Sequence, residues 1–155
     1  ILRCLVGSEM CIRDRGKTLW DAMIDMYEKY GYYKDNVKAI TLKGIEGLEK
    51  IQTILETLRA DAPKEIGGYK VLKVRDYKKD TITDLADGKV TSTGLPASNV
   101  LYYELEDDAW VCVRPSGTEP KVKFYYGIKG TSLEEADAKS ESLGKEVLAM
   151  IEKML

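Results

Sequence analysis

The alternation of apolar and polar side chains between residues 101 and 128 restricts the fold of this chain more than any other feature. Three short stretches alternate in this way, and turn residues separate them, Asp107-Asp108 first and Pro115–Pro120 second. Successive side chains of a strand point to opposite faces of a sheet, so each stretch predicts a strand with one buried face. The apolar positions are Leu101, Tyr103, Leu105, Val111, Val113, Val122, Phe124, Tyr126 and Ile128. The region therefore predicts an antiparallel hairpin extended by a third strand.

Apolar residues recur at helical spacing in three other segments. The first is framed by a possible capping box, Thr18 with Asp21, and by Gly31, a typical helix stop. Spacings of three and four residues place the apolar side chains of each segment on one face. The sequence thus predicts amphipathic helices over residues 18–30, 45–60 and 132–154. In the second helix the predicted apolar face consists of Leu48, Ile51, Leu55 and Leu58.

Two more strands are predicted where β-branched and aromatic residues gather, at Val37–Leu42 and Tyr69–Tyr77. The polar residues 78–97 predict a long loop or a weak hairpin. A sheet that must bury one face against helices is typical of an α+β domain. We therefore expect an antiparallel sheet of about four strands, with the second and third helices packed on one face.

Composition excludes several classes of function. The 155 residues contain no histidine, which excludes His-based general bases, catalytic triads and metal ligands. With 24 basic and 26 acidic residues the net charge is -2, so the chain as a whole offers no positive field to nucleic acid or an anionic membrane. The three cysteines have no metal-like spacing and favour a reducing compartment. We expect a cytoplasmic protein that binds neither nucleic acid nor membrane.

The turn after the predicted hairpin brings together a guanidinium, two hydroxyl groups and a glycine, in the sequence Arg114-Pro115-Ser116-Gly117-Thr118. Arginine can hold two phosphate oxygens at once, Ser116 and Thr118 can donate hydroxyl hydrogens, and Gly117 leaves backbone amides accessible to a tetrahedral anion. Alternation places Lys121 and Lys123 on one face of the next strand, beside the turn. A phosphate site is one interpretation of this pattern. A tight turn with solvated cationic side chains is the other.

The adjacent residues Asp107 and Asp108 and the residue Cys112 could take part in chemistry, but we expect each to have a structural role. Asp107 and Asp108 are adjacent, so their carboxylates point apart, and we expect a turn rather than a metal site. Cys112 lies in a predicted strand beside Trp110, and we expect a small core residue rather than a nucleophile.

The string RPSGTEPKVKFY resembles the phosphate-binding loop in the fourth and last domain of the α-D-phosphohexomutase superfamily. The strings GLPASNVL, FYYGI and GKTLWDAMIDMYEKYGYY are similar to those of bacterial phosphoglucomutases, so the resemblance covers about Gly16 to Leu155. It implies a TBP-like C-terminal phosphohexomutase domain. It also implies that the phosphate of a hexose phosphate that is not being transferred binds to Arg114, Ser116, Gly117, Thr118 and Lys123.

The superfamily reaction requires three further motifs, and no segment of this sequence resembles any of them. A phosphoserine lies in the first domain, three aspartates hold Mg²⁺ in the second, and a sugar-binding loop lies in the third. The resemblance therefore implies part of an enzyme that interconverts glucose 1-phosphate and glucose 6-phosphate. This part has no catalytic residue, metal site or cofactor of its own and is inactive without the remaining mutase domains. A phosphomannomutase is the alternative within the superfamily, and a free-standing anion-binding or protein-interaction module is the alternative outside it.

Three regions are expected along the chain. Residues 1–15 show no periodicity and are expected to be a non-native leader. Residues 16–36 are expected to be the C-terminal end of a preceding, third mutase domain, because the aromatic and charged stretch Gly31–Asn36 separates the first helix from the sheet. Residues 37–155 are expected to be the C-terminal phosphate-binding domain.

Overall fold

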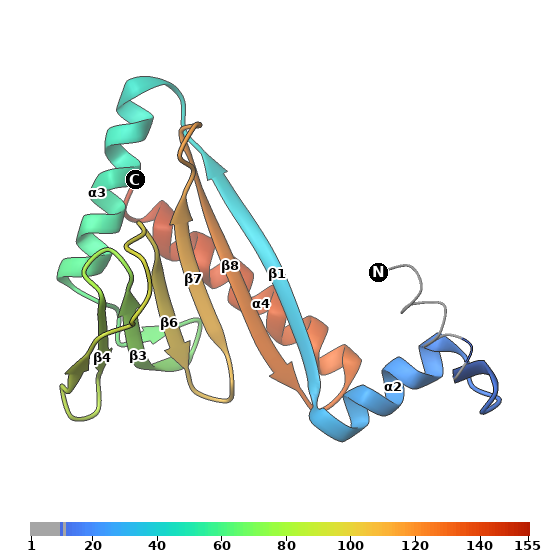
Figure 1. Ribbon diagram of the computed structural model, residues 1–155. Coiled ribbons are helices and arrows are strands. Elements are labelled where there is room, and N and C mark those ends of the chain that lie inside the picture. Colours follow the sequence, from blue (N-terminus) through green and yellow to red (C-terminus); the bar gives the residue numbers. More distant parts are fainter. Residues whose placement is uncertain (1–9, 11) are drawn as a thin grey trace.

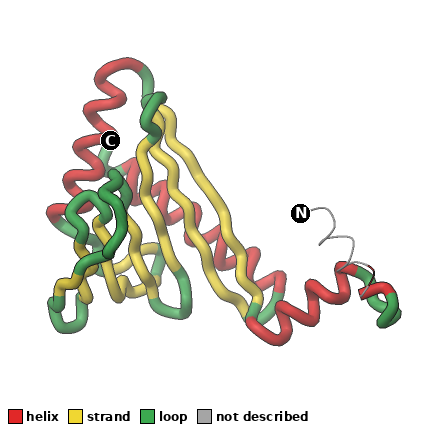
Figure 2. The backbone as a smooth tube through the Cα atoms, viewed as in Figure 1, coloured by secondary structure: helices red, strands yellow, loops and turns green. Residues whose placement is uncertain are grey.

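The computed structural model describes residue 10 and residues 12–155, which form one antiparallel sheet with helices (Figures 1 and 2). The sheet order is β1-β8-β7-β6-β3-β4-β5, and β2 pairs with β3. In chain order the elements are α2 (Leu19–Tyr30), β1 (Tyr32–Thr41), α3 (Gly44–Ala60), β2 (Glu65–Ile66), β3 (Tyr69–Asp76), β4 (Thr81–Asp84), β5 (Val90–Thr91), β6 (Leu101–Leu105), β7 (Trp110–Pro115), β8 (Lys121–Gly130) and α4 (Leu133–Glu152).

Helices α3 and α4 cover the same face of the sheet. The register pairs Tyr103 with Val111 and Val111 with Tyr126, so these side chains share a face. The Tyr103 hydroxyl donates to the Leu58 carbonyl of α3 at 3.4 Å, and the Tyr126 phenol lies against Gly144 of α4. Figure 1 shows α4 running behind β7, β8 and β1. The prediction of an α+β domain with two helices on one face is therefore confirmed.

The predicted alternation supplies most of the sheet's share of the core. Each of the nine apolar positions predicted between 101 and 128 is at most 3% exposed. The helices add Ile51, Ile54, Leu55 and Leu58 from α3, and Ala136, Leu143, Val147 and Ile151 from α4. The prediction for Leu48 was wrong. This residue is 44% exposed because it lies near the start of α3, beyond the edge of the core, and it lines a surface cavity instead.

The sheet has eight strands rather than the predicted four or so. The short strands β2 and β5 contain two residues each, too few for an alternating pattern to be recognised. For residues 78–97 the sequence predicted either a long loop or a weak hairpin. The structure has the hairpin, because β4 and β5 pair within this segment. Strand β1 begins at Tyr32 instead of Val37. It is an edge strand with mostly exposed side chains, so backbone pairing with β8, and not a hydrophobic pattern, defines its first half.

Helix α2 lies outside the unit formed by the sheet, α3 and α4 (Figure 1). Its predicted capping box is present, because the Thr18 hydroxyl accepts from the Asp21 amide at 3.1 Å and the Asp21 carboxylate accepts from the Thr18 amide at 2.8 Å. None of its residues is buried. The ring of Tyr27 stacks on Tyr32 of β1 with centroids 5.5 Å apart. An amphipathic helix normally buries its apolar face, so the apolar face of α2 needs a partner outside the unit formed by the sheet, α3 and α4.

The expected division of the chain stays a prediction. Residues 1–9 and 11 of the expected leader lie outside the described residues. The boundary expected after residue 36 falls inside β1, which pairs with β8 from Tyr32 to Thr41.

The contact between Gly144 and Tyr126 makes α4 sensitive to one added methyl group. A Cβ at Gly144 would overlap the Tyr126 hydroxyl and lie 2.8 Å from its ring carbon Cζ. We expect Gly144→Ala to lower the thermal midpoint, because overpacking costs about 1 to 3 kcal/mol. That cost exceeds the gain in helix propensity of at most about 1 kcal/mol. Thermal unfolding followed by circular dichroism measures the change.

The exposed Ser142→Ala on the same helix is the control for Gly144→Ala and is expected to leave the midpoint nearly unchanged. Adding Tyr126→Phe, which removes the overlapping hydroxyl, is expected to recover part of the loss. A Gly144→Ala chain as stable as the original would show that α4 does not pack closely on β8.

Candidate functional site

The face of the sheet opposite to the helices carries cationic and aromatic side chains. In the register of β7 with β8, Arg114 pairs with Lys123, and Cys112 pairs with Tyr125. These residues alternate with buried ones such as Phe124, so they lie on the face away from α3 and α4. Arg114 and Lys123 are therefore direct cross-strand neighbours beside the turn that joins the two strands.

Ser116 holds this turn together. Its amide donates to the Lys121 carbonyl at 2.7 Å, which closes the base of the turn. Its Oγ accepts from the amides of Thr118 and Glu119 at 3.4 and 3.3 Å. Because a hydroxyl has one donor hydrogen in addition to its acceptor sites, the Ser116 hydrogen is still able to bond to a ligand. The next residues, Gly117 and Thr118, are exposed.

The five residues predicted to bind phosphate line one cavity of about 270 Å³. Its walls are Arg114, Pro115, Ser116, Gly117, Thr118, Lys123 and Tyr125. The turn supplies the hydroxyl and backbone groups, and the paired strands supply the two cations. The structure thus brings together residues that the sequence places on both sides of a turn, and Pro115 and Tyr125 complete the lining.

The two cations of this cavity are not neutralised by neighbouring carboxylates. Among the residues described, every ion pair within 4.0 Å involves a cation other than Arg114 and Lys123. Two positive charges on adjacent strands repel each other across the ladder and attract an anion into the space between them. The electrostatics of the cavity therefore suit a negatively charged ligand.

Gly117 is not required by the packing of the fold. A Cβ at this position would meet nothing within 4 Å, and its φ lies outside the left-handed region that favours glycine. The missing side chain instead leaves open space above the turn, where backbone amides are accessible. This distinguishes Gly117 from Gly144, whose replacement would clash with the core.

A second cavity, of about 630 Å³, lies against the same turn. It is lined by Leu48 and Gln52 of α3, by Ser98, Asn99 and Val100 before β6, and by Arg114, Pro115, Ser116 and Gly117. The sequence did not identify Gln52 or Asn99 as site residues, because each reaches the turn only through the packing of α3 and β6 beside it. Two signals were available for Ser98 and Asn99: they are polar residues directly before a buried strand, and they lie in the string GLPASNVL that carries part of the resemblance.

The other candidates for chemistry lie apart from these cavities. Cys112 is half-buried on the uncovered face of the sheet, not in the core as expected. Burial raises the pKa of its thiol, which Arg114 opposes weakly, so the thiol is neutral near pH 7 and a poor nucleophile, as expected. Asp107 and Asp108 form a turn with φ of 58° and 57°, and Asp108 accepts from Lys129 at 2.9 Å, which lowers its pKa.

The described residues contain no group of three or more His, Cys, Asp or Glu side chains placed to hold a metal ion. None of their helices has both the length and the hydropathy needed to cross a membrane.

Comparisons with known proteins agree with the resemblance of the turn. A family model described as "Phosphoglucomutase/phosphomannomutase, C-terminal domain" matches residues 43–142. A phosphoglucomutase of Staphylococcus aureus is 35% identical over 128 residues, which cover 83% of this chain and 23% of the relative. A phosphoglucomutase of Staphylococcus saprophyticus is 32% identical over 138 residues, which cover 89% and 25% respectively.

The chain thus spans about a quarter of the length of these curated relatives. Among solved structures, the open form of the exocytosis-sensitive phosphoprotein pp63/parafusin from Paramecium matches with a TM-score of 0.44 and 12% identity, over 88% of this chain and 22% of that one. The family model covers well over half of the chain, including α3, the sheet strands β2 to β8 and the turn of the site. The chain therefore belongs to the phosphoglucomutase/phosphomannomutase family and contains its C-terminal domain.

Proposed function

We propose that the cavity formed by Arg114, Ser116, Gly117, Thr118 and Lys123 binds the phosphate group of a hexose phosphate in a phosphoglucomutase. The observation that carries this proposal is the convergence on one cavity of two hydroxyl groups, an open glycine and two cations that form no ion pair among the described residues. The phosphate bound there is the one that is not being transferred. The substrates are glucose 1-phosphate and glucose 6-phosphate.

Each of these residues contributes a different interaction with the phosphate. Arg114 is able to donate two parallel hydrogen bonds to phosphate oxygens, and Lys123 contributes a second positive charge from the adjacent strand. Ser116 and Thr118 donate from their hydroxyl groups, and the open backbone at Gly117 admits the anion. None of these groups forms or breaks a covalent bond, so the role of the site is to bind and to orient.

A site that recognises only a phosphate suits a mutase. The sugar must present each of its two phosphorylated positions in turn to a fixed phosphoryl donor, and a group that contacts only the other phosphate serves both orientations. Holding the substrate in place lowers the entropic part of the barrier without chemistry at this site. The phosphoryl donor, the Mg²⁺ site and the sugar-binding loop belong, in this proposal, to the other domains of a longer, cytoplasmic enzyme.

Phosphate binding is testable on the 155-residue chain itself. We expect inorganic phosphate to shift the backbone amide signals of Arg114, Ser116, Gly117, Thr118 and Lys123 in ¹H–¹⁵N correlation spectra. Hydrogen bonds to charged groups are strong, so Arg114→Ala should weaken this binding by about tenfold to a hundredfold. Arg114→Lys should recover only part of the loss, because an ammonium lacks the two-pronged geometry. Equal affinities for Arg114→Ala and the original chain would overturn the proposed site.

Gly117→Ala separates a ligand site from a simple turn. Because a Cβ meets no atom of the folded chain, we expect the thermal midpoint to change little. The methyl group would occupy the open space above the turn, so phosphate affinity should fall. Loss of stability with phosphate affinity retained would instead favour the turn interpretation. Calorimetric unfolding and the same phosphate titration measure the two effects.

The chain alone is expected to have no mutase activity. Purified chain supplied with glucose 1-phosphate, Mg²⁺ and a glucose bisphosphate primer should form no glucose 6-phosphate in a dehydrogenase-coupled assay, because the chain has no phosphoryl donor. In a complete enzyme that carries this domain, Arg114→Ala should lower kcat/KM by about tenfold or more. Turnover by the isolated chain would contradict the assignment of catalysis to other domains.

A further inference from the structure

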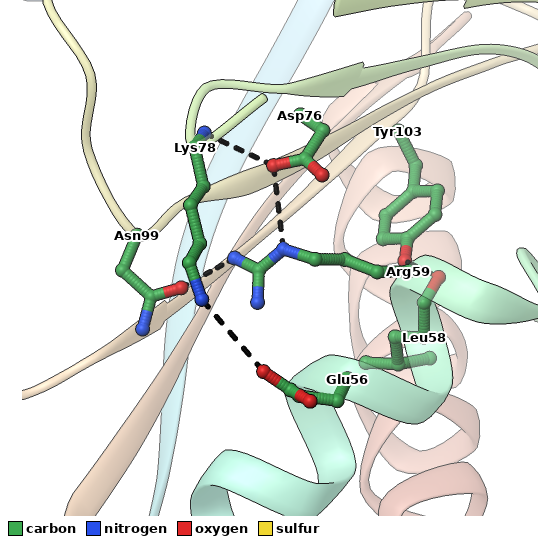
Figure 3. Close-up of polar contacts among 7 residues, drawn as sticks. All are labelled: Glu56, Leu58, Arg59, Asp76, Lys78, Asn99 and Tyr103. Atoms are coloured by element: carbon green, nitrogen blue, oxygen red, sulfur yellow. Dashed lines mark hydrogen bonds and ion pairs between the residues drawn. The ribbon is translucent and has the colours of Figure 1, made fainter. Parts of the chain in front are cut away.

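A buried arginine near the end of α3 connects the helix to two other segments. The Arg59 side chain is only 5% exposed. Its Nε donates to Asp76 Oδ1 at 3.3 Å, and its Nη2 donates to Asn99 Oδ1. Figure 3 shows the guanidinium between these two side chains, with the exposed pair Lys78–Glu56 beside it. Arg59 thus joins α3 to the end of β3 and to the segment before β6.

The acceptor on β3 is itself held in place. Asp76 is 6% exposed, and its Oδ1 also accepts from the Lys78 amide at 3.0 Å. Among the described residues, the remaining guanidinium nitrogen, Nη1, is buried and has no partner. Buried ion pairs add little stability compared with apolar packing, and an unsatisfied buried donor is costly. Stability alone therefore does not account for an arginine at this place, and its hydrogen bond to Asn99 is the contact that is left to explain.

The segment that Arg59 holds forms a wall of the larger cavity. Ser98, Asn99 and Val100 line it together with Arg114 and the turn up to Gly117. Two backbone bonds fasten this segment to Tyr77, because the Ser98 amide donates to the Tyr77 carbonyl at 3.2 Å and the Tyr77 amide donates to the Val100 carbonyl at 3.1 Å. Only Arg59 fixes the side chain of Asn99, according to the hydrogen bonds of the described residues.

We propose that Arg59 is a positioning residue for the phosphate-binding turn, acting through Asn99 and the segment 98–100. Val100 directly precedes Leu101, which pairs with Val113, so the segment runs alongside Arg114. A shift of Asn99 and its neighbours changes the wall of the larger cavity, which Arg114 and the turn also line. This inference rests on the proposed function, because it concerns the same phosphate site.

The test is a phosphate titration of the 155-residue chain, followed through the amide signals of residues 114 and 116–118. Asn99→Ala removes the acceptor and leaves the Arg59–Asp76 pair intact. Arg59→Met combined with Asp76→Asn removes the guanidinium without leaving a buried carboxylate unpaired. Both variants are expected to bind phosphate between about twofold and thirtyfold more weakly, the range typical of residues that act through a network. Arg59→Lys is expected to recover part of the affinity.

Lys78→Met is the matched control. It removes a neighbouring cation of similar length whose side chain pairs with Glu56 at 3.7 Å and has no hydrogen bond to the segment. Its phosphate affinity should equal that of the original chain. Circular dichroism verifies folding, and if the double variant does not fold, Asn99→Ala decides the outcome.

The outcomes separate the two proposals. Folded variants with unchanged phosphate affinity and unchanged signals of residues 114 and 116–118 would overturn the positioning role while leaving the phosphate site intact. A loss in Lys78→Met equal to that in Asn99→Ala would overturn it as well, because the effect would then not depend on Asn99. Failure of the original chain to bind phosphate would overturn the proposed function, and the positioning role with it.

Discussion

The backbone pairing of β7 with β8 is the constraint on which both the core and the candidate site depend. Its register places Val113 beside Phe124 on the helix-covered face and Arg114 beside Lys123 on the other. Successive residues point to opposite faces, so a shift by a single residue would bury the cations and expose the aromatic ring. The burial that stabilises the sheet therefore also fixes which side chains surround the cavity of the candidate site.

The sequence predicted those parts of the fold that depend on residues close together in the chain. The alternation around Phe124 and the capping box at Thr18 are properties of neighbouring residues, and both were confirmed. Strand β1 begins earlier than predicted because its first half is defined by pairing with β8, more than ninety residues later in the chain. Leu48 matched a helical face in sequence, yet α3 extends past the core at that point. Neither fact is visible in local spacing.

The candidate site likewise combines residues that are close in sequence, which could be predicted, with residues that meet only in the folded chain. The turn residues from Arg114 to Thr118 follow one another in the chain, so the sequence was sufficient to nominate them, and the cavity contains them together. Lys123 required only the strand alternation. Arg59 and Asn99 are forty residues apart and meet only because α3 packs beside the start of β6, so their connection became visible in the structure alone.

The unburied surface of α2 affects how this chain behaves by itself in solution. Leu19, Trp20, Met26 and Tyr30 are each half or more exposed on one short helix. Exposed apolar patches promote self-association, and a net charge of -2 provides little electrostatic repulsion against it. The exposed apolar side chains of α2 therefore favour self-association of the isolated chain at high concentration. A shorter chain that begins at β1 would keep the whole sheet and lose this source of aggregation.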